Sequence, residues 1–450
     1  MASANTSHTD DFWDGELDPL PWEEVLDWQA RILPSTVADV RARSPFYRRK
    51  FGADVRSLGD FGQLPFTTKE ELRQAQDEAD ASAPYGAAQA VPTERVSQTL
   101  ASSGTTGHPT LYALTATDVD RWSDAVANML FTAGVRETDT FALLTGMPMV
   151  AGGQPYAGGI RRVGANLVWL GGMPTERQLD IMRKVRTTGI LATTSFAAHL
   201  ADRCQDIIGV PAPALGVRRL LCGGEPGLAQ PEIRRQIADG WGADGVHEVM
   251  GLCDVMAGMW AECEHGGGMH FTAARHVLVE LIDPQTLERV EWKEGATGEL
   301  VYTPLGREGT PVIRFRSADR AVVTGTSCAC GRGAPRIRCV GRTDDMLIYK
   351  AMNVFPSAIR DVVLDVAAGR VSSRMRVLKH HRDQVRFDSP IPLQVEAASM
   401  DEAEAAKTLI ESAVRSRLQV RVDVDIVPPG SLPQGQYKNP LVQVSEGTGA

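Results

Sequence analysis

The sequence predicts an α/β protein with a large N-terminal domain of mixed βαβ sheets and a small C-terminal α+β domain. Strand and helix patterns alternate between residues 140 and 222, as they do in βαβ units that build a mostly parallel sheet. Segments 275–282 and 298–303 alternate with a period of two, which indicates a more antiparallel, barrel-like portion. The pattern restarts after about residue 345, and 450 residues exceed what one compact core usually holds.

The first ninety or so residues are predicted to be helical. Apolar residues recur at helical spacing over 22–37 and 69–79, and Pro34, Pro45 and Pro65 are expected to interrupt the helices. Beyond them, short apolar runs predict strands, and longer amphipathic runs predict helices. The predicted strands are 95–100, 111–114, 140–144, 189–193, 217–222 and 245–249, and the predicted helices are 176–186 and 196–208.

The last hundred or so residues form the second predicted domain. Its expected elements are a segment at 357–364, strands near 374–378 and 393–395, and a helix at 401–418. Gly341–Met346 combines a flexible glycine, a cation and two acids at the boundary between the two domains.

Composition and charge exclude several classes of protein. The formal net charge of −9 argues against general nucleic-acid binding, and no run approaches the ~20 apolar residues that span a bilayer. The N-terminus is acidic and lacks a signal-peptide pattern, so we expect a cytoplasmic protein. Seven cysteines, an odd number in a large chain, argue against a disulfide framework.

The most informative segment is Ser102–Thr110, which reads SSGTTGHPT. Its hydroxyls, glycines and backbone N–H groups suit an anion such as a nucleotide triphosphate, and it joins two predicted strands as a hairpin tip. It is not a Walker loop, because no Gly-Lys-Ser/Thr sequence closes it. A polar surface turn would have the same composition, so the loop alone indicates phosphate binding only weakly.

Other polar groups follow predicted strands, where ligands of open α/β sheets bind. Gly223–Gly227 (GGEPG) exposes backbone that would suit a flat base, or it is a tight turn. Asp254 would hold Mg²⁺, or cap a helix. Asp319 would accept hydrogen bonds from ribose hydroxyls, and Arg342 lies at the domain boundary, although either would also fit a surface salt bridge. Lys438 lies in a late loop, where an ammonium can move in and stabilise developing charge.

Three cysteines and two histidines make a separate cluster. Cys328 and Cys330 form a tight C-x-C-G turn, and Cys263, His265 and His270 lie upstream in a glycine-rich loop. Three thiolates and one imidazole are a ligand set for a structural zinc ion. Reduced thiols without a metal are the alternative.

In this order, the motifs resemble the phenylacetate–CoA ligase branch of the adenylate-forming superfamily of acyl-CoA synthetases, luciferases and peptide-synthetase adenylation domains. The resemblance covers almost the whole chain. The matching segments are Phe12–Trp13, Leu64–Lys69 (LPFTTK), Ser102–Thr110, Gly224–Pro226, Gly251–Leu252, Arg342–Asp345, Asn353–Pro356 and Lys438.

The resemblance implies a two-step, Mg²⁺-dependent reaction. A carboxylate attacks the α-phosphate of ATP, giving an acyl adenylate and pyrophosphate, and a thiol, that of CoA in this branch, then takes the acyl group. It implies an ATP- and acid-binding domain at 1–343 and a mobile lid domain at 344–450, with a hinge near Asp344. A small aromatic acid as substrate, a structural Zn²⁺ and a homodimer follow from the same analogy.

The resemblance also assigns roles to single residues. Ser102, Ser103, Gly104, Thr105, Thr106 and Gly107 would hold the β- and γ-phosphates, Gly223, Gly224, Glu225 and Pro226 would line the adenine and acyl pocket, and Asp319 and Arg342 would contact ribose. The catalytic candidates are Lys438, Asp254 and Glu225, and the zinc ligands would be Cys263, His270, Cys328 and Cys330, with His265 as a rival for the histidine position.

Several positions depart from the family pattern. Many of the changes lie on the side of the second step, so adenylation is the firmer expectation and transfer to CoA the weaker one. The departures are His108 for lysine, Met250 for tyrosine, Asp254 for glutamate, Ala318 for glycine, Lys350–Ala351 for an arginine–glycine pair, and Arg360 for glutamate.

The leading hypothesis is therefore an AMP-forming ligase for a small aromatic acid, with CoA as the acceptor. Phe196, Tyr156 and Ala151–Gly153 are compatible with a flat aromatic pocket. One alternative keeps adenylation but changes the chemistry around it: the acceptor is a carrier-protein thiol, or nitrite is activated to diazotise an aryl amine. A second alternative is a degenerate, non-enzymatic nucleotide-binding module.

Overall fold

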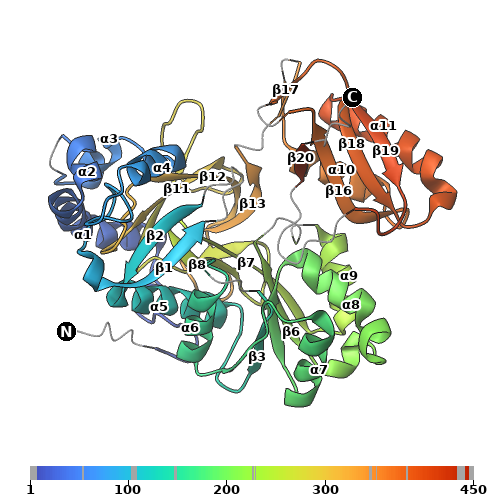
Figure 1. The fold of residues 1–450 in the computed structure, drawn as a ribbon, viewed down its shortest axis with the longest axis horizontal. Helices are drawn as coiled ribbons and strands as arrows, with labels where there is room; N and C mark the ends of the chain where they lie inside the picture. The colour runs from blue at the N-terminus through green and yellow to red at the C-terminus, as the bar shows by residue number, and fades with distance from the viewer. Residues whose placement is uncertain are drawn as a thin grey trace.

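The structure is a computed structural model that describes residues 8–52, 55–102, 109–145, 149–224, 228, 230–343, 347–350, 352–381, 384–432 and 441–444. A large body holds the N-terminal three quarters of the chain, and a smaller lobe holds the C-terminal part (Figure 1). None of the described helices has the length and apolarity needed to cross a bilayer.

One 11-stranded sheet runs through the large body. At one end, five strands pair in parallel, in the order β4-β3-β5-β6-β7. Antiparallel pairing begins between β7 and β8. The predicted antiparallel portion is therefore confirmed as the other half of the same sheet. The strands, in sheet order, are β10 (Val277–Ile282), β11 (Thr297–Pro304), β12 (Phe315–Gly325), β13 (Arg336–Arg342), β9 (Met269–Phe271), β8 (Met256–Glu262), β7 (Gly245–Leu252), β6 (Arg219–Gly223), β5 (Gly189–Ala192), β3 (Thr140–Leu143) and β4 (Asn166–Trp169).

Helices cover both faces of the parallel half because its strands are apolar on both faces. Phe141 and Leu143 of β3 join the core cluster under α5 and α6, whereas Ala142 between them joins the cluster under α7, α8 and α9. This alternation is the period-two geometry of a strand. The helices are α5 (Ala116–Thr132), α6 (Gln154–Val163), α7 (Thr175–Val185), α8 (Thr194–Ile208) and α9 (Pro231–Trp241).

The N-terminal segment is helical, as predicted, but Pro34 does not interrupt it. Helix α1 runs from Trp22 to Arg43 with Pro34 inside. A proline within a helix removes one backbone hydrogen bond, and the burial of Leu33, Val37 and Val40 in one apolar cluster offsets that loss. The helices that follow are α2 (Pro45–Lys50), α3 (Leu58–Gln63) and α4 (Lys69–Asp77).

A two-stranded hairpin carries the predicted phosphate loop. Strand β1 (Val96–Ser102) pairs with β2 (Thr110–Thr115), and Ser102 lies opposite Thr110 at the end of the ladder. The hairpin lies over the middle of the large body (Figure 1). Short 3₁₀ helices occur at Thr93–Arg95, Ala212–Leu215 and Met400–Glu402.

The C-terminal lobe has its own apolar core, built by two helices against a four-stranded sheet of order β19-β18-β16-β20. Leu364 of α10 is an exception, because it packs into the cluster of α7–α9 in the large body. Beside this contact, a cavity of about 480 Å³ separates α8 and α9 from β16. The elements of the lobe are β14 (Leu347–Tyr349), β15 (Met352–Val354), α10 (Pro356–Val366), β16 (Val371–Lys379), β17 (Arg386–Phe387), β18 (Ile391–Ala397), α11 (Ala403–Leu418), β19 (Val422–Val427) and β20 (Val442–Val444).

Candidate active site

The predicted magnesium ligand, Asp254, lies in the turn between β7 and β8 and is 6% exposed. The Tyr112 hydroxyl donates a hydrogen bond of 2.6 Å to its Oδ1 atom, and Lys69 Nζ lies 3.2 Å from the same oxygen. Burial, followed by the nearby charge of Asp254, raises the pKa of Tyr112 well above its usual range. Tyr112 therefore remains a proton donor to the carboxylate.

The fully buried side chain of Arg307 holds the backbone of the turn that carries Asp254. Arg307 Nη1 donates to the backbone oxygens of Asp254, at 2.7 Å, and Val255, at 3.3 Å. Its guanidinium carbon lies 5.3 Å from the centre of the Tyr112 ring, so one side chain braces both partners of the Tyr112–Asp254 bond. Burial lowers the pKa of Arg307.

The end of the β1–β2 hairpin presents two hydroxyls that face each other across the ladder. Ser102 and Thr110 are 3% and 2% exposed, and neither side-chain oxygen has a hydrogen-bond partner among the described residues. A buried hydroxyl without a partner carries a free-energy cost, which a phosphate group would remove. Of the predicted loop, Ser103, Gly104, Thr105, Thr106 and Gly107 lie outside the described residues.

The predicted adenine segment begins at the end of β6. A Cβ atom on Gly223 would lie 2.2 Å from the Val249 carbonyl oxygen, so only glycine fits between β6 and β7 there. Gly224 follows with a φ of +80°, which favours glycine as well. The two glycines thus let the backbone turn sharply at the edge where ligands of parallel sheets bind. Glu225 and Pro226 lie outside the described residues.

The two predicted ribose-binding residues are cross-strand neighbours. Asp319 of β12 pairs in register with Arg342 of β13, and Arg342 Nη1 lies 3.0 Å from Asp319 Oδ1. Ala318, just before the aspartate, has a φ of +63°. An L-residue pays a steric cost in this left-handed region and glycine does not, which explains why glycine suits the position.

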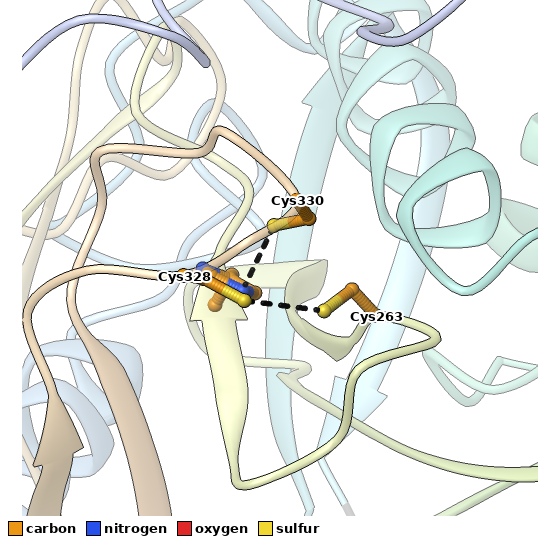
Figure 2. A group of neighbouring side chains, drawn as sticks. Cys263, Cys328 and Cys330 are labelled. Carbon is orange, nitrogen blue, oxygen red and sulfur yellow. Dashed lines mark hydrogen bonds between the residues drawn. The ribbon is translucent and has the colours of Figure 1, made fainter.

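Four ligating side chains meet beside β9: His270 lies on that strand, Cys263 follows β8, and the other two cysteines lie between β12 and β13. Figure 2 labels the three cysteines. The ligand atoms of Cys263, His270, Cys328 and Cys330 all lie within 4.8 Å of one another. Cys330 Sγ is 3.4 Å from His270 Nε2, and Cys263 Sγ is 3.8 Å from Cys328 Sγ. The hydrogen bond from Cys263 lowers the pKa of the Cys330 thiol and raises that of Cys263. Three sulfurs and an imidazole at this spacing fit a tetrahedral zinc ion.

The structure also chooses between the two candidate histidines. His270 is fully buried within the cluster, whereas the His265 side chain is 43% exposed and pairs with Glu264. His270 is therefore the histidine of this cluster.

Comparison with known proteins identifies the family. The chain is 32% identical to a phenylacetate–coenzyme A ligase of Thermus thermophilus over 94% of its own length and 96% of the relative. It is 29% identical to the Escherichia coli phenylacetate–coenzyme A ligase, with the same two coverages. The chain belongs to the phenylacetate–coenzyme A ligase family. It is thus an ATP-dependent, adenylate-forming ligase, as the sequence motifs predicted.

Other comparisons agree with membership of the phenylacetate–coenzyme A ligase family. Residues 351–443 match the family model of the AMP-binding enzyme C-terminal domain. A 2-hydroxyisobutyryl-CoA ligase in the postadenylation state, in complex with 2-HIB-AMP, superimposes with a TM-score of 0.87 at 25% identity, over 99% of this chain and 94% of that one. The same ligase in its thioesterification state gives a TM-score of 0.71, over 99% and 95% of the two chains.

The sequence missed three side chains around the carboxylate of this family member. Lys69 closes the LPFTTK segment, which marked the resemblance but carried no assigned role. Tyr112 was predicted only as part of the strand at 111–114, and Arg307 carried no prediction. The place of Lys69 at the end of the LPFTTK segment is the only sequence signal that could have indicated one of these three residues. Lys438 lies outside the described residues, as does Asp344.

Proposed function

We propose that this ligase activates a small aromatic carboxylic acid and transfers it to CoA. The observation that carries the proposal is the identity of about a third to a phenylacetate–coenzyme A ligase over nearly the whole length of both chains. In the first step, an oxygen of the acid attacks the α-phosphorus of ATP and the bond to pyrophosphate breaks. In the second, the CoA thiol attacks the acyl carbonyl and AMP leaves.

The side chains support this chemistry mainly by positioning and charge. We assign Asp319 and Arg342 to the ribose hydroxyls, and Ser102 with the loop that follows it to the β- and γ-phosphates. Tyr112 and Lys69 contact Oδ1 of Asp254, and we assign the carboxylate to a Mg²⁺ ion, which would neutralise phosphate charge. Glu225 and Lys438 keep their proposed roles in the acyl pocket and in the first step.

We place the acyl group of the acid near Tyr156, on the β7–β8 side of the large sheet. The Tyr156 hydroxyl donates to the Ala257 carbonyl oxygen at 3.1 Å, which fixes the ring. A Cβ on Gly251 would lie only 1.7 Å from the same oxygen, so only glycine fits at this position beside β8. Phe196 instead packs in the α7–α9 cluster, on the opposite face of the sheet from the cluster that Tyr156 touches.

We propose two domains, 1–343 and 344–450, with a hinge near Asp344. The separate core of the C-terminal lobe supports this division, and the higher TM-score against the postadenylation state supports an arrangement close to that of the first step. We also propose that Cys263, His270, Cys328 and Cys330 hold a structural zinc ion. Free thiols throughout the described chain are consistent with the cytoplasm, where ATP and CoA are available.

The proposal is tested by pyrophosphate release from ATP and Mg²⁺ with a panel of aryl acids, followed by mass spectrometry of the products with CoA. We expect acid-dependent pyrophosphate, an aryl-CoA product, and loss of the first step in Lys438→Ala. Absence of pyrophosphate with every acid contradicts the proposal.

A second acceptor remains a candidate because Lys350–Ala351 replaces the family's arginine–glycine pair. A methyl group there would narrow the path of a pantetheine chain. The same screen with a carrier protein, or with nitrite and an aminoaryl acid, separates the cases. Strong aryl-CoA formation rejects the alternative.

A further inference from the structure

A cavity of about 440 Å³ lies where four segments of the large body meet. The segments are residues 10–12 near the N-terminus, the end of α5 with the turn after it, the turn after β8, and the loop between β12 and β13. None of the described residues that we assign to ATP or to the acid lines this cavity. Its volume is that of a site for a small molecule.

Arg332 brings a buried positive charge into the wall of the cavity, where it is only 7% exposed. Its Nε atom has no hydrogen-bond partner among the described residues, and its Nη2 atom makes one long bond of 3.4 Å to the Asp11 carbonyl oxygen. The guanidinium carbon lies 5.3 Å from the centre of the Phe12 ring. Since a buried cation without a counter-ion is costly in free energy, this environment favours an anion.

Arg136 presents a second guanidinium group to the same cavity. Its Nη1 atom donates to the carbonyl oxygens of Phe131, at 2.8 Å, and Val135, at 2.9 Å, and its guanidinium carbon lies 3.7 Å from the centre of the Phe131 ring. Burial, followed by the charges of Arg219 and Arg332, lowers the pKa of Arg136. The two arginines of the cavity are therefore close enough to repel each other.

No carboxylate in the described part of the chain forms an ion pair with either of these arginines. The charge of Asp18 reaches Arg332, but other groups hold both oxygens of this carboxylate. Oδ1 accepts a hydrogen bond of 3.0 Å from the Asn128 side chain, and Oδ2 accepts one of 3.2 Å from the Asp14 amide. Asp18 thus leaves the Nε atom of Arg332 without an acceptor.

The acidic residues that line the cavity lie at its rim. Asp10 and Asp11 are exposed, and the Glu264 side chain is 84% exposed. Glu264 acts on Arg136 less strongly than Arg332 does. Water screens charges at such positions, so positive charge dominates the interior of the cavity.

We propose that this cavity is an oxyanion site, in which a phosphate group or a carboxylate lies between the guanidinium groups of Arg136 and Arg332. The planar fork of an arginine donates paired N–H groups to anions of this shape. Phe12 and Phe131 hold the two forks in place, so little side-chain freedom is lost on binding. The site goes beyond the proposed ligase activity and does not depend on it.

The test titrates inorganic phosphate, and separately citrate, into the wild type, Arg332→Met and Arg136→Met by calorimetry, at one ionic strength set with sodium chloride. We expect each substitution to weaken binding at the cavity by about 10-fold or more, through loss of a hydrogen bond to a charged group. Phosphate bound at the proposed nucleotide site contributes equally in every variant, so the difference between titrations reports on the cavity. The anion with the larger difference identifies the ligand class, phosphate or carboxylate.

Asp11→Asn removes a negative charge from the rim and should strengthen anion binding by about 2- to 5-fold, the effect of one exposed charge. A purely structural role of the two arginines would not produce this gain. Arg235→Met is the matched control, because it removes an exposed arginine of α9 that pairs with Glu232. It should bind both anions as the wild type does.

Melting temperatures show which variants fold, and Arg136→Met carries the test where Arg332→Met does not. Equal anion affinities in the wild type and the arginine variants overturn the inference, as does the absence of binding of both phosphate and citrate. Those are the results expected if the arginines only balance the charge of the neighbouring thiol cluster.

Discussion

Tyr112 and Asp254, which lie 142 residues apart in the chain, share a buried hydrogen bond of 2.6 Å. The bond holds the Oδ1 atom of the carboxylate, which also lies 3.2 Å from Lys69 Nζ. Burial raises the pKa of the Tyr112 phenol well above its usual range, so the hydroxyl acts here as the donor. In the proposed first step, this pair would fix the carboxylate that we assign to Mg²⁺.

Removal of that donor should impair the first step. We expect Tyr112→Phe to lower kcat/KM for pyrophosphate release by about 10-fold or more, the loss of a hydrogen bond to a charged group, and to raise the Mg²⁺ concentration needed for half-maximal rate. Tyr47→Phe is the control, since it also removes a buried phenol hydroxyl, one that accepts from the Ile313 amide. An unaltered Mg²⁺ dependence in Tyr112→Phe would contradict the role of the pair.

The Asp319 carboxylate should distinguish ribose from deoxyribose. We expect Asp319→Asn to raise the KM for ATP by about 10- to 100-fold and to remove most of the enzyme's preference for ATP over 2′,3′-dideoxy-ATP. Steady-state kinetics with both nucleotides provide the measurement. A variant that keeps the full preference would show that Asp319 does not contact the sugar.

Ala318 should be a site of stored backbone strain. Because Ala318 has a φ of +63°, Ala318→Gly relieves a steric cost of about 1 kcal/mol, partly offset by the greater freedom of glycine in the unfolded chain. We expect a small rise in stability, measured by urea unfolding. Ala367→Gly, at the end of α10 where φ is −110°, is the control and should not stabilise.

The thiol cluster should bind one metal ion per chain. We expect elemental analysis to find zinc in the wild type and none in Cys330→Ser, whose melting temperature should fall by several degrees because metal binding contributes folding free energy. Cys339→Ser removes a cysteine outside the cluster and should keep its zinc. Equal zinc content in both variants would rule out the cluster as the site.

Glu248 should make stability depend on pH. Burial, and then the charge of Glu262, raises the pKa of Glu248 to about 7. In the unfolded state this carboxyl has its usual pKa of 4.5, so between pH 4.5 and 7 the folded state keeps a proton that the unfolded state has lost. The stabilising contribution is therefore complete at low pH and is lost as pH rises toward 7, by about 3 kcal/mol in the free energy of unfolding. Glu248→Gln should remove this slope. Unfolding curves at pH 5, 6, 7 and 8 test it, and parallel slopes in both proteins would refute it.

The strands and loops of this fold could be predicted because their signals are local. The run at 140–144 and the loop at 102–110 are legible in a few adjacent residues, and β3 and the β1–β2 hairpin lie there. The break predicted at Pro34 was wrong because burial of Leu33 and Val37 outweighs one lost hydrogen bond. That balance depends on distant residues, which no local pattern displays.

Part of the candidate site could likewise be predicted from the sequence, and part could not. The Cys–His cluster was predicted from ligand types, and the structure brings its four residues together. Lys69 and Arg307 were missed, because each acquires its role only when α4 and the turn after Pro304 meet at Asp254. A lone basic residue has no spacing to mark it, so only the folded arrangement reveals the contact.

Leu364 belongs to helix α10 of the C-terminal lobe, but its side chain packs with the apolar core residues of α7–α9 in the large body. If the lobe swings as proposed, this leucine moves into water, at a cost of about 2 kcal/mol. The contact would then favour the present orientation by roughly 30-fold. A ligand that drives the proposed second step would have to offset that bias before the lobe turned.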